Sequence, residues 1–214
     1  GYLKILITHN TYFDNFNNLT EFLNLHTDIS HSKNLLIQIF SGLIEKEILE
    51  ELSNFLLKKL PQANIIGSTT DGEILDDKVS TKQIVISFSL FEKTNIKISS
   101  IENNCHEDSF KCGQDIAKEI HTKDSKVFIL FASGLCVNGE DFLNGIQDIS
   151  KDVIVAGGLS ADNAHFKNDY LICNNKVQST GAVGISLNSK ELHVKNKFSL
   201  AWENLGRKFV VNKS

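Results

Sequence analysis

Hydrophobic residues recur along this chain with two different spacings. Apolar residues at positions 43, 44, 48, 49, 52, 55, 56 and 60 follow steps of three and four, which predicts an amphipathic helix over 43–60. Short apolar runs at 35–40 and 63–66 flank this helix and are typical of buried strands. Because a helix joins the two strands, the sequence predicts a βαβ unit with parallel pairing.

Further strands and helices are expected along the rest of the chain. A strand over the first ten residues and a weak helix at 16–31 come before the βαβ unit. The elements expected after it are strands at 83–91 and 95–101, a helix at 108–120, a strand at 126–131, a helix at 139–149 and a strand at 153–156. From about residue 170 to residue 211 the pattern predicts three or four antiparallel strands, with turns at Asn174-Asn175 and Asn188-Ser189.

The connections between these elements indicate the fold class. Only Glu92, Lys93 and Thr94 separate two of the predicted strands, so an antiparallel hairpin is expected there. Helical crossovers come early in the chain and a β-rich antiparallel part comes late. The sequence therefore predicts an α/β fold with mixed sheet layers and helices packed on the sheet. No Pro-, Ser- or Gly-rich linker interrupts the chain, and residues 1–214 are expected to form one domain.

Composition narrows the classes of partner. The net charge is −4 and the 22 Lys and Arg residues are scattered, whereas nucleic-acid-binding proteins concentrate basic residues on one face. We therefore expect no nucleic-acid partner. No apolar run approaches the roughly 20 residues that span a bilayer, so no membrane partner is expected either.

Cysteine and methionine usage indicates the compartment and the origin of the chain. The cysteines at 105, 112, 136 and 173 form no Cys-x-x-Cys pair, and we expect free thiols in a reducing cytoplasm. The first residue is Gly1, and the sequence contains no methionine. We therefore expect this sequence to be a piece of a longer protein.

Turns rich in glycine and hydroxyl side chains follow several of the predicted strands. Ligands of α/β sheets bind outside the carboxyl ends of the strands, where such loops converge. Glycine lets the backbone approach a ligand, and Ser, Thr, Asn and Asp supply hydrogen bonds. The sequence predicts a polar ligand pocket, although turn formation alone also explains this composition. The candidate ligand-binding residues are Ser41, Gly67, Ser68, Thr69, Thr70, Asp71, Ser133, Gly134, Asn138, Gly157, Gly158, Ser160, Asp162 and Asn163.

The side chains of these turns suggest how a small polar ligand is held. Asp71 or Asp162 is a candidate for binding an amine, because charge-assisted hydrogen bonds are the strong ones. A carboxylate would instead be bound by backbone amides and by the hydroxyls of Ser68, Thr69, Thr70 and Ser160.

Catalytic and metal motifs find little support in the sequence. It lacks a Gly-x-Ser-x-Gly elbow, a Gly-x-Gly-x-x-Gly fingerprint and a phosphate loop. A pair of Cys136 and His165 remains an alternative, because such partners meet only in the fold. His26 and His31 are five residues apart, out of step with the four-residue spacing that places two imidazoles on one helical face. We expect no catalytic residue and no metal.

A family resemblance rests on several short strings in a consistent order. They are LLIQIFSG at 35–42, LP at 60–61, IIGSTTDGEI at 65–74, VISFS at 85–89, FEKT at 91–94, NGE at 138–140, GGLSAD at 157–162, GAVGI at 181–185, and Trp202 with Gly206. Together they resemble the N-terminal part of FIST domains over residues 30–212. Ser133 stands where many relatives have an acidic residue, so this turn lacks the charge that the family pattern places there.

The resemblance implies an intracellular, bacterial type of sensory domain without enzymatic activity. Such a domain binds a small polar ligand, with amino acids as the leading candidates, and signals its presence. The implied partners are a C-terminal FIST domain outside this sequence and an output module, such as a histidine kinase, a cyclic-dinucleotide enzyme or a chemotaxis receptor. No cofactor is expected.

Other functions remain open at this level. Some FIST relatives bind haem and respond to nitric oxide, and haem iron needs an axial donor, which is often histidine. The available histidines are His9, His26, His31, His106, His121, His165 and His193. A hydrolase that uses Cys136 or a serine is a weaker alternative, and a protein–protein scaffold is another.

Overall fold

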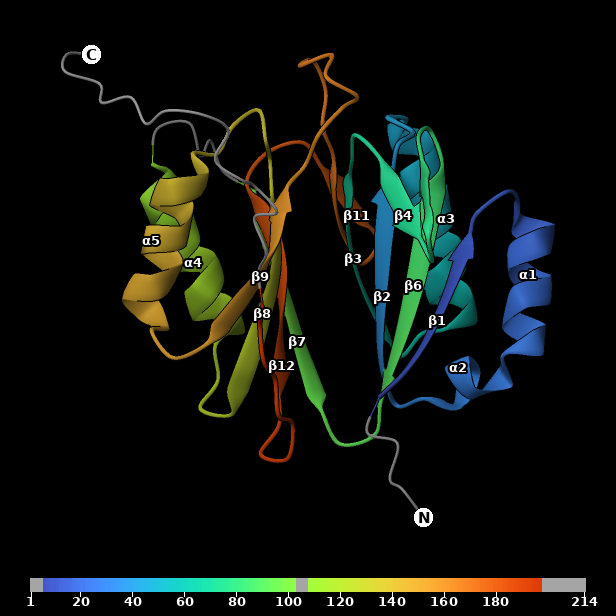
Figure 1. The fold of residues 1–214 in the computed structure, drawn as a ribbon, viewed down its shortest axis with the longest axis horizontal. Coiled ribbons are helices and arrows are strands. Elements are labelled where there is room, and N and C mark those ends of the chain that lie inside the picture. The colour runs from blue at the N-terminus through green and yellow to red at the C-terminus, as the bar shows by residue number, and fades with distance from the viewer. Residues whose placement is uncertain (1–5, 103–107, 198–214) are drawn as a thin grey trace, which may run out of the picture.

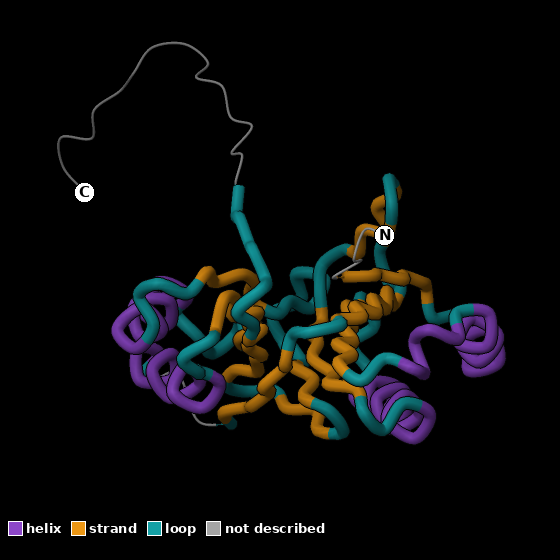
Figure 2. The backbone as a smooth tube through the Cα atoms, turned by 90° about the horizontal axis from the view of Figure 1, so that it is seen from below, coloured by secondary structure: helices purple, strands orange, loops and turns teal. Residues whose placement is uncertain are grey.

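Two β-sheets lie face to face, and each carries helices on its outer side (Figure 1). The computed structural model describes residues 6–102 and 108–197, so the strands expected after residue 197 lie outside the described residues. Figure 2 shows the strand layers in the middle and the helices on the two flanks. The layers follow the order α, β, β, α. This arrangement confirms the α/β fold class that the sequence predicts.

The first sheet has six strands and includes the predicted βαβ unit. In spatial order its strands are β1 (Leu6–Tyr12), β6 (Ile84–Phe91), β2 (Asn34–Ser41), β3 (Ala63–Thr69), β10 (Leu171–Cys173) and β11 (Lys176–Gln178). Its outer face carries α1 (Phe16–Leu25), α2 (Thr27–His31) and α3 (Lys46–Lys59). β2 and β3 pair in parallel, which confirms the predicted βαβ topology.

The second sheet has four strands, in the order β7 (Asn95–Ile101), β12 (Ala182–Asn188), β8 (Ser125–Ala132) and β9 (Ile154–Leu159). It carries α4 (Ser109–Ile120) and α5 (Gly139–Ile149). β8 and β9 also pair in parallel, so α5 is the crossover of a second βαβ unit. β4 (Glu73–Leu75) and β5 (Lys78–Ser80) form a separate two-stranded hairpin, in which β4 packs beside β6 and β1.

Buried side chains fill each space between two layers. In β2, Ile37 and Ile39 pack in the cluster under α3, whereas Leu36 packs in the cluster between the sheets. A strand that is buried on both faces needs apolar residues at consecutive positions, which explains the apolar run at 35–40, interrupted only by Gln38. Between the sheets, Leu36 belongs to the same cluster as Phe131 and Ile185 from the second sheet.

α3 begins at Lys46, three residues later than the apolar spacing suggests. The Ser41 hydroxyl group accepts a hydrogen bond from the Leu43 amide and donates one to the Leu43 carbonyl oxygen. These bonds hold the backbone in a turn and keep Leu43 out of the helix, although its side chain still packs on the core.

In the described part of the chain, no helix is both long and apolar enough to cross a membrane.

The predicted hairpin of residues 83–91 and 95–101 is wrong. β6 lies between β1 and β2 in the first sheet, whereas β7 pairs with β12 in the second. Residues 92–94 therefore cross from one sheet to the other. Three extended residues reach about 10 Å, which matches the usual distance of about 10 Å between stacked sheets. A three-residue connection thus fits either a hairpin or this crossing, and packing between the sheets decides.

The antiparallel C-terminal part is confirmed within the described residues, but it is divided between the sheets. β10 and β11 pair around the predicted Asn174-Asn175 turn, and β10 also pairs with β3. Asn174 has a positive φ of 52°, a conformation that asparagine adopts more readily than most residues. β12 ends at Asn188, the second predicted turn, and lies in the other sheet.

Candidate functional site

The predicted turns meet at one end of the sandwich. The Thr70 amide donates to the Ser41 carbonyl oxygen at 2.8 Å, which joins the turns after β2 and β3. The Ala161 amide donates to the Thr69 carbonyl oxygen at 3.0 Å, so the turn after β9 in the second sheet reaches the turn after β3 in the first. The Asn163 side-chain amide donates to the Gly42 carbonyl oxygen at 3.0 Å. The carboxyl ends of parallel strands from both sheets therefore converge.

A buried carboxylate, Asp169, lies where these turns meet. Its side chain is only 2% exposed. The Ser133 hydroxyl group donates to its two oxygens at 3.1 and 2.9 Å, and the Ser160 hydroxyl group donates to Oδ2 at 2.5 Å. The Gly134 amide also donates to Oδ2, at 2.7 Å. Asp169 therefore ties the turn after β8 to the turn after β9.

Three of the four hydroxyl groups proposed to bind the carboxylate of a ligand form hydrogen bonds within the protein. Ser160 binds Asp169, and the Thr70 hydroxyl group donates to Glu73 at 2.5 Å. The Thr69 hydroxyl oxygen accepts from the Tyr170 amide at 3.0 Å. Ser68 is buried within β3. These contacts give three of the four hydroxyl groups a role within the protein, and their binding of a ligand carboxylate stays a prediction.

Asp162 is held in place by the backbone that follows it. Its carboxylate accepts hydrogen bonds from the amides of Lys167 at 2.7 Å, Asn168 at 3.0 Å and Phe166 at 2.7 Å. These bonds, with the Lys167 amide contributing most, lower the pKa of Asp162 below its usual value, against an opposing effect of burial. Asp162 therefore stays ionised and fixes the conformation of the loop between β9 and β10.

A small pocket opens between these turns, with a volume of about 240 Å³. Three of its lining residues are acidic, and none is Lys, Arg or His. The complete lining consists of Asp71, Gly134, Leu135, Leu159, Ser160, Ala161, Asp162, Ala164, Phe166 and Asp169. We call this cavity the acidic pocket. The Asp71 side chain is tied to the loop by the Ala164 amide, which donates to Oδ1 at 3.2 Å. The pocket presents negative charge and suits a cation better than an anion.

Only some of the predicted ligand-binding residues reach the acidic pocket. Asp71, Gly134, Ser160 and Asp162 line it. Others hold the surrounding turns together through the hydrogen bonds given above; these are Ser41, Thr69, Thr70, Ser133 and Asn163. Ser68 is buried in β3, as described above. The pocket lining also does not include the last four candidates, which are Gly67, Asn138, Gly157 and Gly158.

Structural roles account for two of these remaining residues. Gly67 lies inside β3, where an added Cβ would come 2.4 Å from the Ile39 carbonyl oxygen, so glycine permits close strand packing. The Asn138 side chain caps α5 by accepting from the amides of Glu140 and Asp141. Both residue types are explained by local backbone requirements.

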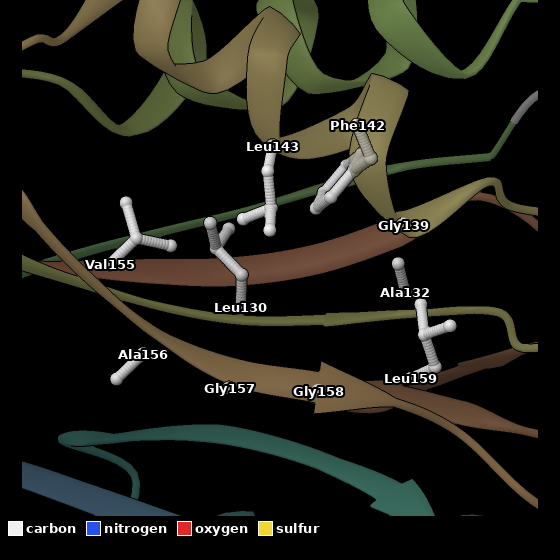
Figure 3. Close-up of a pocket in the computed structure, with 10 residues that line it drawn as sticks. All are labelled: Leu130, Ala132, Gly139, Phe142, Leu143, Val155, Ala156, Gly157, Gly158 and Leu159. Atoms are coloured by element: carbon white, nitrogen blue, oxygen red, sulfur yellow. The ribbon is translucent and has the colours of Figure 1, made fainter. Parts of the chain in front are cut away.

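Gly157 and Gly158 line a second, apolar pocket of about 270 Å³ (Figure 3). Figure 3 shows Leu143 and Phe142 of α5 facing Val155 and Leu130 across this cavity. Here β9 forms the edge of the four-stranded sheet. Leu159 lines both this pocket and the acidic pocket, so the two cavities are neighbours.

The alternative nucleophile and base lie in different surroundings. Cys136 packs against the core cluster of α4, α5 and β8. His165 is exposed on the loop after β9. The fold gives this pair no shared pocket among the residues that line the two cavities.

Asp169 is the site residue that the sequence did not reveal. It follows Asn168 and precedes Tyr170 and is not part of a glycine-rich turn. Its main hydrogen-bond partners are 9 to 36 positions away in the sequence. No local pattern indicates such a contact.

Comparison with known proteins identifies the family. A search of curated proteins gave no match. A family model described as the FIST N domain matches residues 35–214, which is most of the chain. This chain therefore belongs to the FIST N domain family, whose members are sensory domains of signal transduction.

Proposed function

We propose that this domain senses a small ligand with a positively charged amino group, and that the ligand binds in the acidic pocket. The observation that supports this most directly is the presence of Asp71, Asp162 and Asp169 in one pocket without a basic lining residue. An ammonium group has three N–H donors and no acceptor, and it binds carboxylates through strong charge-assisted bonds.

Asp71 is the carboxylate best placed to contact such a ligand. Asp162 and Asp169 are 4% and 2% exposed, and their oxygens already accept several hydrogen bonds from the protein. Asp71 is exposed and accepts one hydrogen bond, from the Ala164 amide. The two buried carboxylates then supply fixed negative charge, and Asp71 supplies the direct hydrogen bond.

An amino acid is a suitable ligand in one orientation only. Its ammonium group enters the pocket, while its carboxylate points away from the three aspartates, because like charges at short distance repel. A volume of about 240 Å³ limits the bound part to a small molecule. This orientation reverses the assignment of the Ser and Thr hydroxyl groups made from the sequence.

The loop between β9 and β10 provides a route from binding to signalling. Asn163, Ala164 and Phe166 all have positive φ values, between 54° and 60°. Such backbone conformations are costly for residues with a side chain. A ligand that binds Asp71 and this loop together favours one loop conformation over others, which is the requirement for a population shift. The loop joins the two sheets, so its conformation also affects both.

The partner that receives the signal is part of the proposal. FIST domains are sensor domains that pair with output modules. We propose a C-terminal FIST domain as the neighbour in the longer protein, and a kinase, a cyclic-dinucleotide enzyme or a chemotaxis module as the output.

Thermal unfolding of the purified chain against amines, amino acids and their N-acetylated counterparts tests the ligand class. A ligand at about 100 times its Kd adds about 2.7 kcal/mol to the free energy of unfolding. We expect stabilisation by compounds with a free ammonium group and none by the N-acetylated forms. Equal stabilisation by both forms would contradict the role of the carboxylates, and a Soret band in the absorbance spectrum of the purified protein would favour a haem sensor.

Matched variants locate the site. Asp71→Asn removes one charge from the pocket without adding volume, and we expect it to weaken ligand binding at least about tenfold, in line with the strength of a charge-assisted hydrogen bond. Asp77→Asn makes the same change in the exposed turn of the nearby β4–β5 hairpin, outside the pocket. Isothermal titration of both variants is the measurement, and equal affinities would place the ligand elsewhere.

A further inference from the structure

A second cluster of polar side chains lies on the opposite flank of the first sheet, away from the acidic pocket. His9 comes from β1, His26 from the corner between α1 and α2, and Asp28 from the first turn of α2. One ligand atom from each residue lies within 4.8 Å of the other two. Two imidazoles and a carboxylate are the donor set of many zinc sites that keep one position open.

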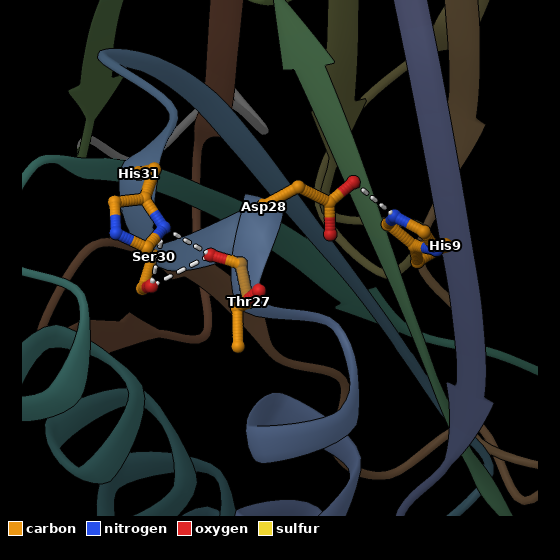
Figure 4. A network of polar contacts seen from close by, with 5 residues as sticks. All are labelled: His9, Thr27, Asp28, Ser30 and His31. Carbon is orange, nitrogen blue, oxygen red and sulfur yellow. Dashed lines mark hydrogen bonds and ion pairs between the residues drawn. The ribbon is translucent and has the colours of Figure 1, made fainter.

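The contacts within the cluster are close. His9 Nε2 lies 2.7 Å from Asp28 Oδ2, and Figure 4 shows the Asp28 side chain extending toward the His9 ring. The rings of His9 and His26 are 4.3 Å apart between centroids.

The fold holds the two histidines in place by separate means. His9 shares the helix-facing side of β1 with Ile7, which packs on the core under the helices. His26 ends α1 with a non-helical backbone, and its amide donates to the Phe22 carbonyl oxygen. The His26 ring packs against the Phe22 ring at 4.5 Å between centroids. Both imidazoles are therefore positioned before any ion binds.

We propose that His9, His26 and Asp28 bind a zinc ion. With zinc–ligand bonds of 2.0–2.2 Å, tetrahedral ligand atoms lie about 3.3 Å apart. The His9–Asp28 contact has to widen slightly from its 2.7 Å hydrogen bond, and the longest separation has to shorten from at most 4.8 Å. Side-chain rotations supply both changes. The His9 and Asp28 side chains are 20% and 44% exposed, so solvent reaches the fourth position.

This site departs from the expectation that the chain binds no metal. The sequence draws attention to His26 and His31, whose spacing does not suit one helical face. In the structure the His31 Nδ1 atom is hydrogen-bonded to the Thr27 carbonyl oxygen at 2.6 Å, and Figure 4 shows this ring directed away from His9. The partner of His26 is His9, from a strand 17 positions earlier in the sequence.

The zinc site lies outside the part of the chain that defines the family. The family match begins at residue 35, and all three ligands precede it. Bound zinc ties β1, an edge strand, to the corner of α1 and α2. The expected consequence is local: this flank of the sheet becomes more stable, because an ion that binds only the folded state stabilises it.

Zinc titration of tag-free, EDTA-treated protein tests the proposal. We expect one zinc ion per chain by isothermal titration and a higher melting temperature with zinc. Cobalt(II) substituted for zinc is expected to give the intense visible bands of a tetrahedral site. Absence of zinc binding to the wild-type protein, or the weak spectrum of octahedral cobalt, would overturn the assignment.

Variants separate this site from adventitious binding at surface histidines. We expect His26→Gln and Asp28→Asn each to weaken zinc binding at least about 100-fold, because even outer-shell changes cost 10–100-fold. His31→Gln, which removes a neighbouring exposed imidazole, is expected to leave the affinity unchanged. The melting temperature of each zinc-free variant reports whether it folds. An equal loss in His31→Gln and His26→Gln would refute the site.

Discussion

Ser160 Oγ donates a 2.5 Å hydrogen bond to Asp169 Oδ2, and this contact joins the two ends of the loop between β9 and β10. β9 belongs to the four-stranded sheet and β10 to the six-stranded sheet. Asp169 also accepts from Ser133 and Gly134, at the end of β8. The buried Asp169 carboxylate thus connects the turns after β8 and β9, which line the acidic pocket.

Replacing Asp169 with asparagine is expected to destabilise the fold. The amide keeps one acceptor oxygen and places a donor against the Ser160 and Ser133 hydroxyl groups and the Gly134 amide. Hydrogen bonds to a buried charge contribute about 1.5–3 kcal/mol each, and we expect a total loss of about 2–4 kcal/mol. Urea denaturation measures it. Asp77→Asn in an exposed turn is the control, with an expected change within about 0.5 kcal/mol; a similar effect of both variants would contradict this role of Asp169.

The pH dependence of stability is expected to include a contribution from Asp162. Its pKa is lowered in the folded state, chiefly by the Lys167 amide and then by the amides of Asn168 and Phe166. The stability that it contributes is therefore present above the unfolded pKa of about 3.9 and is lost as the pH falls through the lower folded value. We expect the difference in unfolding free energy between wild type and Asp162→Asn to be largest near neutral pH and to shrink below about pH 3.9. A difference that stays constant down to acid pH would show that Asp162 ionisation does not hold the loop.

The crossing of α4 and α5 depends on two glycines. A Cβ on Gly145 would come 2.0 Å from the Phe110 carbonyl oxygen, and a Cβ on Gly113 would come 2.1 Å from the Phe142 carbonyl oxygen. Gly145→Ala forces these helices apart, and we expect a loss of about 1–3 kcal/mol despite the higher helix propensity of alanine. In Gly139→Ala, on the same helix, the nearest atom is the Leu159 Cδ1 at 3.7 Å, an ordinary contact. Thermal melting of the two variants is the comparison, and equal melting temperatures would contradict the tight crossing.

Cys173 is expected to react slowly with alkylating reagents. Burial raises the pKa of its thiol, and the hydrogen bond with Ser100 and the charge of Lys176 only partly offset this effect. Because the thiolate is the reactive form, the rate of iodoacetamide modification of Cys173 should rise at higher pH in the folded protein than in the urea-unfolded protein. Mass spectrometry of modified peptides gives the rate at each pH. Identical pH profiles in the two states would rule out this effect of burial.

Several elements followed from the sequence alone. The apolar spacing over 43–60 and the flanking apolar runs correspond to α3, β2 and β3, with parallel pairing. The asparagine turn at 174–175 and the convergence of glycine-rich turns at strand ends also hold in the structure. The helix, the strands and the asparagine turn depend on neighbours two to four residues apart or on backbone conformations that few residue types adopt, so the local sequence determines them. The turns converge because the carboxyl ends of parallel strands lie at the same edge of a sheet.

Partners across long sequence distances were decided only by the tertiary structure. The pattern of apolar residues predicted the strands β6 and β7, but it did not show that they belong to different sheets. Packing between the sheets decides that. The hydroxyl groups of Ser160, Thr70 and Thr69 form hydrogen bonds with Asp169, Glu73 and Tyr170, which no local pattern indicated. His26 meets His9 rather than His31. A side chain's periodicity fixes which face it occupies, whereas its partner depends on which element packs against that face, and only the assembled layers determine that.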